Sequence, residues 1–160
     1  MVSPKERPSV RQRLDALGLE LQPTTKPMGN YLPAVVEGNL IFCAGVTCMQ
    51  DGSPMFRGKF GRELTAQQGA AAARVAVLNA LQKMVDVIGD PDQIGGIVKL
   101  VAHINCTEDF VDHALISNGA SDLLVDLFGD SGRHARLSLG VNSLPGNLPL
   151  ELEIIARLAG

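Results

Sequence analysis

The chain has 160 residues, of which 46% are hydrophobic, and its formal net charge is −3, so it is large enough to bury a core as a single domain. It has five phenylalanines, one tyrosine and no tryptophan, and this acidic, aromatic-poor composition argues against nucleic-acid binding, which uses clustered cations or stacking platforms. No apolar run is long enough to span a bilayer, and no secretory leader is visible, so we expect no membrane association.

The N-terminal segment predicts a short helix between two irregular stretches. We expect residues 1–9 to form a flexible, solvated arm. Ser9 and Gln12 have the spacing of a capping box, and apolar residues follow at helical spacing. A helix is therefore predicted over about residues 10–17, as the first part of an N-terminal helix and linker that covers residues 10–28.

Two apolar segments, at residues 32–36 and 40–44, follow this linker. Glu37-Gly-Asn39 separates them, and a short turn of this kind between apolar segments predicts a β-hairpin. Asp51-Gly-Ser-Pro54 marks a further turn, and residues 55–63 read as a charged, glycine-containing loop.

Two longer helices are predicted in the middle of the chain. Thr65 and Gln68 form a second capping box ahead of a helix over about residues 66–88, which Gly89-Asp-Pro91 ends. A second apolar stripe predicts a helix over about residues 111–128. Between them a β-rich segment covers Ile94 to Cys106. Its alternation places Val98, Leu100, Ala102 and Ile104 on one face, and Lys99, His103 and Asn105 on the other.

The last quarter of the chain has two alternating segments on either side of a turn rich in proline and glycine. Arg136 and Ser138 share the polar face of the first segment, and Glu151 and Glu153 share that of the second. We expect the two segments to be neighbouring strands. This brings an arginine, a hydroxyl group and two carboxylates together, either as a solvated sheet face or as a site for a small anionic substrate.

The order ββ-α-β-α-ββ predicts an α+β domain with a mixed sheet, two main helices on one face and a short N-terminal helix. The second sheet face mixes charged residues with apolar ones, and subunit association is one way to cover it.

Cysteine and histidine usage indicates no metal site. Cys43, Cys48 and Cys106 have no metal-ligand spacing, and His103 and His113 have no companions at useful spacing. The cysteines read as buried thiols in a reducing compartment, so we expect a cytoplasmic protein.

Several of these motifs together resemble the Rid family (YjgF-type proteins). They are Gly29-Asn-Tyr31, Gly38 to Gly45, Asn118 as a residue before a helix, and Ala135-Arg136 through Leu144-Pro145 to Leu150-Glu151-Leu-Glu153. The resemblance covers about residues 29–158, and the stretch 132–136 with the N-terminal helix resembles the longer, poorly characterised branch. It implies one Rid-like domain over residues 1–160, with a chorismate-mutase-like fold.

The resemblance also implies an activity and an assembly. Rid proteins hydrolyse reactive 2-imino acids to 2-keto acids and ammonia, at ligand sites between the subunits of a homotrimer, and the resemblance implies no metal, nucleotide or covalent cofactor. Arg136 matches the arginine that binds the substrate carboxylate, a role that suits the planar guanidinium. Glu151 matches the acid that positions a water. Tyr31 and Asn118 match residues that line or brace the pocket.

Three positions depart from the family pattern. Ser138 stands where many members have cysteine, Ala44 stands where deaminating members have serine, and Val46 replaces the glutamine that follows. Ser138 and Ala44 are still expected to line the site. We expect these changes to make the pocket more apolar and to change or remove imine hydrolysis.

Other interpretations remain open. The chain could be a non-catalytic binder or sensor of a small keto-acid-like metabolite. Ribonuclease activity is less favoured because of the acidic charge, and chorismate mutase activity rests on fold alone. Without the resemblance, Arg136 reads as an ion-pairing residue and Tyr31 as a packing residue. Glu153 reads as solvated or paired across subunits, and His134 is assigned to the opposite strand face from Arg136, with a structural role.

Overall fold

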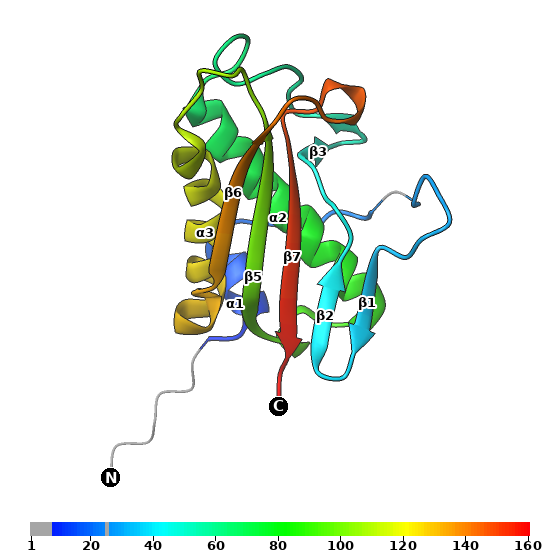
Figure 1. The fold of residues 1–160 in the computed structure, drawn as a ribbon. Helices are drawn as coiled ribbons and strands as arrows, with labels where there is room; N and C mark the ends of the chain where they lie inside the picture. Colours follow the sequence, from blue (N-terminus) through cyan, green and yellow to red (C-terminus); the bar gives the residue numbers. More distant parts are fainter. Residues whose placement is uncertain (1–7, 25) are drawn as a thin grey trace.

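The computed structural model describes residues 8–24 and 26–160, and its elements follow the predicted order (Figure 1). Most of the arm predicted at residues 1–9 lies outside the described residues. The helices are α1 (Val10–Ala16), α2 (Ala66–Ile88) and α3 (His113–Phe128), with 3-10 turns η1 (Pro91–Gln93), η2 (Gly129–Gly132) and η3 (Pro145–Asn147). The strands are β1 (Ala34–Glu37), β2 (Leu40–Cys43), β3 (Met49–Gln50), β4 (Ser53–Pro54), β5 (Ile94–Asn105), β6 (Ala135–Val141) and β7 (Leu150–Leu158).

Local sequence signals account for where the helices begin. Ser9 and Gln12 form a reciprocal capping box ahead of α1, and Thr65 and Gln68 form another ahead of α2. Each box satisfies backbone N–H groups that the first turn of a helix leaves unpaired. Gly89 ends α2 in the left-handed conformation, which glycine adopts without steric cost. These predicted boundaries are confirmed.

Five strands form one mixed sheet in the order β1-β2-β7-β5-β6, and β3 and β4 form a separate small hairpin. β5 runs parallel to β6 and antiparallel to β7. The expectation that the two C-terminal strands are neighbours is therefore wrong, because β5 lies between them (Figure 1). α3 provides the crossover that a parallel β5–β6 pair requires, and the chain then returns to the other side of β5.

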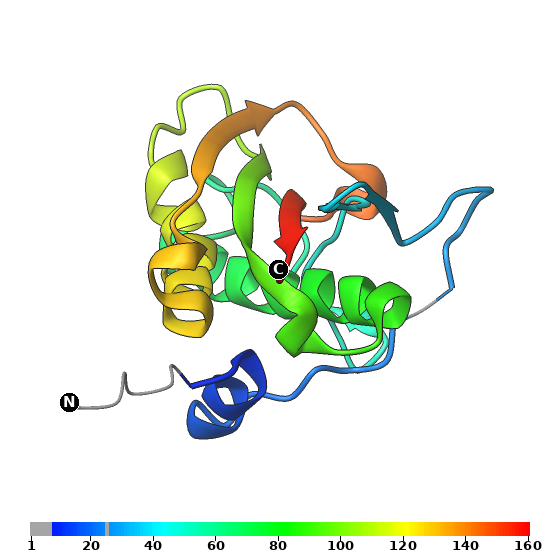
Figure 2. The same ribbon diagram turned by 90° about the horizontal axis from the view of Figure 1, so that it is seen from below.

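α2 and α3 cover one face of the sheet and leave the other face open, as Figures 1 and 2 show together. The core fills the space between these layers, with side chains such as Leu100 and Ile154 from the sheet and Leu81 and Leu123 from the helices fully buried. α1 lies at one end of the helical layer (Figure 2). No helix within the described part of the chain is long and apolar enough to cross a membrane.

A bulge in β5 changes the predicted faces of that strand. The register with β7 shifts between Ile97 and Lys99, and Ile97 is buried whereas Val98 is exposed. An extra residue in one strand interrupts the alternation of side chains. The assignment of Val98 to the buried face is therefore wrong, while Leu100 and Ala102 lie on that face as predicted.

The two long helices approach each other closely near the middle of α3. A Cβ atom at Gly119 would lie 2.2 Å from the backbone oxygen of Ala70 in α2, so only glycine fits at this crossing. The crossing fixes the position of the neighbouring residue, Asn118, which points toward the sheet edge formed by β6.

Candidate functional site

Arg136 and Glu151 lie on opposite faces of the sheet. In the sheet register Arg136 lies beside Leu100 of β5, and Glu151 lies beside His103 of the same strand. Leu100 and His103 are three residues apart beyond the bulge, so their side chains point to opposite faces. Leu100 faces the helices and is fully buried. Arg136 therefore points toward α3, whereas Glu151 points to the open face.

Two side chains of α3 hold the guanidinium of Arg136. Arg136 Nη1 donates to Asn118 Oδ1 at 2.8 Å and to Ser121 Oγ at 3.1 Å. Asn118 and Ser121 are one helical turn apart and thus project from the same side of α3. We call Asn118, Ser121 and Arg136 the arginine half-site.

The arginine half-site leaves the charge of the guanidinium without a counter-ion. Both oxygens that accept from Arg136 belong to neutral groups. Within residues 8–24 and 26–160 no carboxylate lies within ion-pair distance of it, and the side chain is exposed. An exposed, oriented guanidinium of this kind can bind an anion with two parallel hydrogen bonds.

Ser138 lies on the same face of β6 as Arg136 but is engaged elsewhere. Its Oγ donates to Ser117 Oγ at 2.7 Å, and Ser117 is fully buried in α3. This hydroxyl pair joins β6 to the helix next to the arginine half-site. Ser138 thus lies next to the arginine half-site, but its hydroxyl group points toward α3.

Glu151 lies on the open face against the loop that follows β2. A Cβ atom at Gly45 would lie 2.1 Å from Glu151 Oε1, so the glycine makes room for the carboxylate. The carbonyl of Gly45 accepts from Lys83 Nζ at 3.0 Å, which ties this loop to α2. We call Ala44, Gly45 and Glu151 the glutamate half-site. Among the described residues, no side-chain partner hydrogen-bonds the carboxylate of Glu151.

An open hollow of about 300 Å³ adjoins the glutamate half-site. Its lining is mostly apolar and consists of Leu32, Val35, Phe42, Cys43, Ala44, Glu153 and Ile155. Burial raises the pKa of the Cys43 thiol to about 11, and the ammonium of Lys83 opposes this rise. The thiol therefore stays neutral near pH 7.

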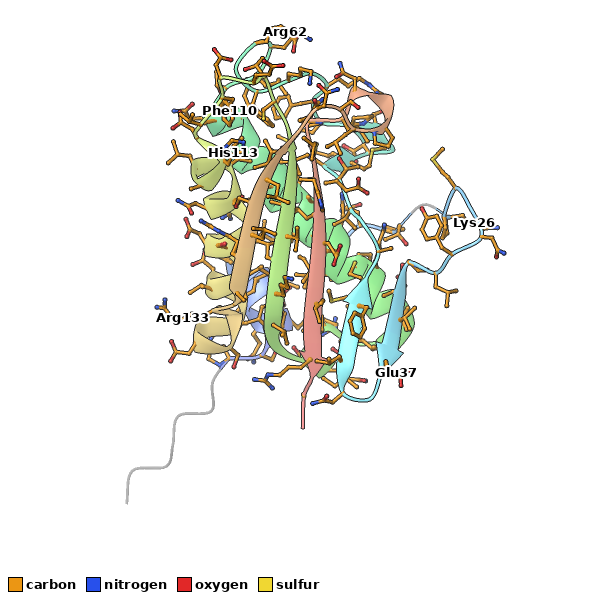
Figure 3. All side chains as sticks on the ribbon, viewed as in Figure 1. Lys26, Glu37, Arg62, Phe110, His113 and Arg133 are labelled. Atoms are coloured by element: carbon orange, nitrogen blue, oxygen red, sulfur yellow. The ribbon has the colours of Figure 1, made fainter. Side chains whose placement is uncertain are left out.

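Tyr31 lies apart from both half-sites, and Val46 adjoins the glutamate half-site but is buried in the core. Tyr31 is 52% exposed, in the loop before β1. Lys26 in this loop and Arg133 just before β6 mark opposite edges of the sheet (Figure 3). Tyr31 and Arg136 of one chain are thus far from each other. Val46 is buried and bridges to Leu152, so it belongs to the core rather than to the hollow beside Ala44.

Known proteins with the same architecture identify the chain. A family model described as "YjgF/chorismate_mutase-like, putative endoribonuclease" matches residues 11–157. The chain belongs to this YjgF family. A curated relative, Protein TCP17 of Trypanosoma cruzi, is 33% identical over 93% of this chain and 94% of its own length.

Solved structures of YjgF relatives agree along almost the whole chain. The protein Atu1372 of Agrobacterium tumefaciens, described as of unknown function, is 32% identical, with a TM-score of 0.85 over 94% of this chain and 92% of its own. A protein of Shewanella oneidensis described as a "putative endoribonuclease" is 31% identical, with a TM-score of 0.90 over 94% of this chain and 100% of its own. The resemblance to the family and the chorismate-mutase-like fold are therefore confirmed.

Two residues behind Arg136 were not predicted from the sequence as part of the site. Ser121 contacts Arg136 directly, and His134 Nε2 lies 3.0 Å from Ser121 Oγ. The assignment of His134 to the strand face opposite Arg136 is wrong, because residues two apart in an extended chain share a face. The three-residue spacing of Asn118 and Ser121 was the signal that could have found the second contact. The described residues contain no group of His, Cys, Asp and Glu able to hold a metal ion.

Proposed function

We propose that this YjgF protein hydrolyses small 2-imino or enamine acids to 2-keto acids and ammonia. The observation that carries the proposal is the exposed guanidinium of Arg136, held by neutral oxygens of Asn118 and Ser121 with no carboxylate beside it. A charge that the fold orients but does not neutralise favours an anionic ligand, because the ligand supplies the missing counter-ion. A planar carboxylate fits the guanidinium fork.

The proposed active site is shared between subunits of a homotrimer. Arg136 and Glu151 lie on opposite faces of one sheet, and Tyr31 lies at the far edge. These groups can contact one ligand only if they come from different chains. The open sheet face supports such an assembly, since Val35, Phe42, Leu137 and Leu139 lie on it and each exposes between 40% and 45% of its surface. Apolar faces of this kind are typically covered by subunit association.

The proposed reaction adds water across the C=N bond of a 2-iminium acid. Arg136 holds the carboxylate of the substrate, and Glu151 of a second chain accepts a hydrogen bond from the attacking water and aims its oxygen at the imine carbon. One proton of the water passes to the nitrogen to give a protonated carbinolamine. This intermediate expels ammonia while its hydroxyl oxygen becomes the keto oxygen and releases the second proton to the solvent. One water is consumed, no electrons are transferred, and no cofactor is needed. Asn118 braces the arginine, and Ser138 and Ala44 line the cleft.

The decisive test follows the hydrolysis of 2-iminobutanoate generated in the assay mixture. We expect the wild-type protein to accelerate the release of 2-oxobutanoate, and Arg136→Ala to raise KM by about 100-fold because a charge-assisted bidentate contact is lost. Arg133→Ala, which removes an exposed arginine three residues away, is the matched control. Equal activity of the wild type and Arg136→Ala would remove Arg136 from the mechanism.

The same proteins separate the rival functions. A wild type that binds pyruvate through Arg136 but does not accelerate imine hydrolysis is a sensor rather than an enzyme. Cleavage of a labelled RNA, unaffected by Arg136→Ala, would instead support the ribonuclease activity that the family description mentions. Sedimentation equilibrium tests the assembly, and a mass equal to one chain would contradict a shared site.

A further inference from the structure

A histidine lies behind the arginine half-site, linked to it through one hydroxyl group. His134 Nε2 is 3.0 Å from Ser121 Oγ, and His134 Nδ1 is 2.6 Å from the carbonyl oxygen of Gly132. Ser121 Oγ in turn accepts from Arg136 Nη1 at 3.1 Å. Gly132, His134, Ser121 and Arg136 therefore form one continuous chain of hydrogen bonds.

The chemistry of each group fixes the direction of this chain. A carbonyl oxygen only accepts, so Nδ1 of His134 carries the hydrogen that faces Gly132. In the neutral ring Nε2 is then an acceptor, and the hydroxyl of Ser121 donates to it. This turns the lone pairs of Ser121 Oγ toward Arg136, which has donors and no acceptor. Without an acceptor at His134, the hydroxyl hydrogen is free to rotate toward the guanidinium.

The chain also determines which edge of the guanidinium remains available. Nη1 has two hydrogens, and Asn118 Oδ1 and Ser121 Oγ accept them both. Nη2 and Nε have no partner among the described side chains and backbone groups, and together they form one of the two edges that fit a carboxylate.

We propose that His134 is a positioning residue for ligand binding. It orients the Ser121 hydroxyl, which holds Nη1 of Arg136, and the Nη2–Nε edge is thereby presented to the carboxylate of the ligand. This inference rests on the proposed function for the identity of the ligand. The hydrogen-bond chain itself lies within one protomer and can be tested without any ligand.

Substitutions along the chain, measured with pyruvate as the carboxylate probe, test the proposal. We expect Ser121→Ala to weaken pyruvate binding about tenfold, because the charged guanidinium of Arg136 loses the hydroxyl oxygen that accepts its hydrogen bond. His134→Phe, which keeps a ring but no acceptor, should weaken it by about fivefold. His134→Gln keeps an acceptor and a donor and should stay within about twofold of the wild type. Ser53→Ala, at an exposed serine in β4, is the control for loss of a hydroxyl.

The double variant Ser121→Ala/His134→Phe distinguishes a relay from two unrelated packing effects. Because His134 acts only through Ser121, the double variant should bind pyruvate as weakly as Ser121→Ala alone. In imine hydrolysis these variants should raise KM and leave kcat unchanged, as expected for a contact present in both the ground state and the transition state. Additive effects in the double variant, or a His134→Gln protein as weak as His134→Phe, would overturn the proposal.

Nitrogen-15 NMR tests the positioning role of His134 without a ligand. If the wild type neither binds pyruvate nor hydrolyses imines, the proposed function is refuted, but the NMR result still tests the positioning role. At a pH where the His134 ring is neutral, we expect the tautomer that carries its hydrogen on Nδ1. We also expect faster rotation of the Arg136 guanidinium in both Ser121→Ala and His134→Phe. A neutral ring that carries its hydrogen on Nε2, or an Arg136 rotation that neither substitution changes, would overturn the positioning role.

Discussion

The two half-sites differ in how much of their geometry a single chain determines. The arginine half-site is held by hydrogen bonds that Arg136 in β6 donates to the carboxamide and hydroxyl oxygens of two α3 side chains. The carboxylate of Glu151 occupies the space left by Gly45 and has no side-chain hydrogen-bond partner among the described residues. Each chain thus orients the group proposed to bind the ligand, whereas the carboxylate proposed to direct water is held less firmly within the described part of the chain.

Glu151→Gln should show the largest difference between the roles of the two half-sites, because it should change kcat but not pyruvate binding. The amide has the same shape but no longer accepts a proton or a strong hydrogen bond from water, so we expect kcat to fall about 100-fold or more. Pyruvate binding, measured by calorimetry, should stay within about twofold of the wild type. Glu37→Gln, at the exposed end of β1, is the control. If pyruvate binding falls as much as kcat, both half-sites bind the ligand and the distinction between them is lost.

The next largest effect is expected in assemblies that mix two inactive variants, where part of the imine hydrolysis activity should return. Refolding Arg136→Ala together with Glu151→Gln in equal amounts produces some interfaces that combine an intact arginine from one variant with an intact glutamate from the other. With random mixing, about one quarter of the sites are intact, so activity should recover to roughly a quarter of the wild-type value. Each variant refolded alone is the control. A mixture as inactive as its parents would mean that both residues act from one chain.

Gly119→Ala tests the rigidity of the arginine half-site. The new Cβ would meet the backbone of Ala70, which cannot move aside as a side chain can, so we expect the free energy of unfolding to fall by about 1–3 kcal/mol. Urea unfolding measures this change. Asp122→Ala, at an exposed position of the same helix, should have little effect. Unchanged stability in Gly119→Ala would show that the α2–α3 crossing adapts easily.

Gly45→Ala is the corresponding change in the glutamate half-site, and it should affect stability least. Its new Cβ would meet the far end of the Glu151 side chain, which can rotate away. We expect the free energy of unfolding to change by less than about 0.5 kcal/mol, with kcat reduced about tenfold because the carboxylate is displaced. A loss of stability as large as that of Gly119→Ala would mean that the two half-sites are equally rigid.

Local signals in the sequence predicted most of the secondary structure. Capping boxes at Ser9 and Thr65 and the glycine at 89 depend on residues within one turn, so their effect can be read without tertiary information. The prediction that helices cover one face of a mixed sheet also follows from the order of the elements.

The arrangement of the candidate site could not be predicted in the same way. The insertion of β5 between β6 and β7 is a long-range pairing, and alternation within one strand does not determine its neighbours. The position of Glu151 relative to Arg136 depends on that pairing. The bulge near Val98 and the contact of His134 with Ser121 likewise require the packed structure.

Opposite-face placement of Arg136 and Glu151 also has a consequence for measurement at low protein concentration. If each catalytic centre needs two chains, dilution below the concentration at which subunits associate removes centres without unfolding any chain. Specific activity should then fall on dilution and recover on concentration, while the circular dichroism spectrum of the secondary structure stays constant. The number of catalytic centres per chain then depends on the total protein concentration through the association equilibrium, so the rate is not simply proportional to the amount of enzyme.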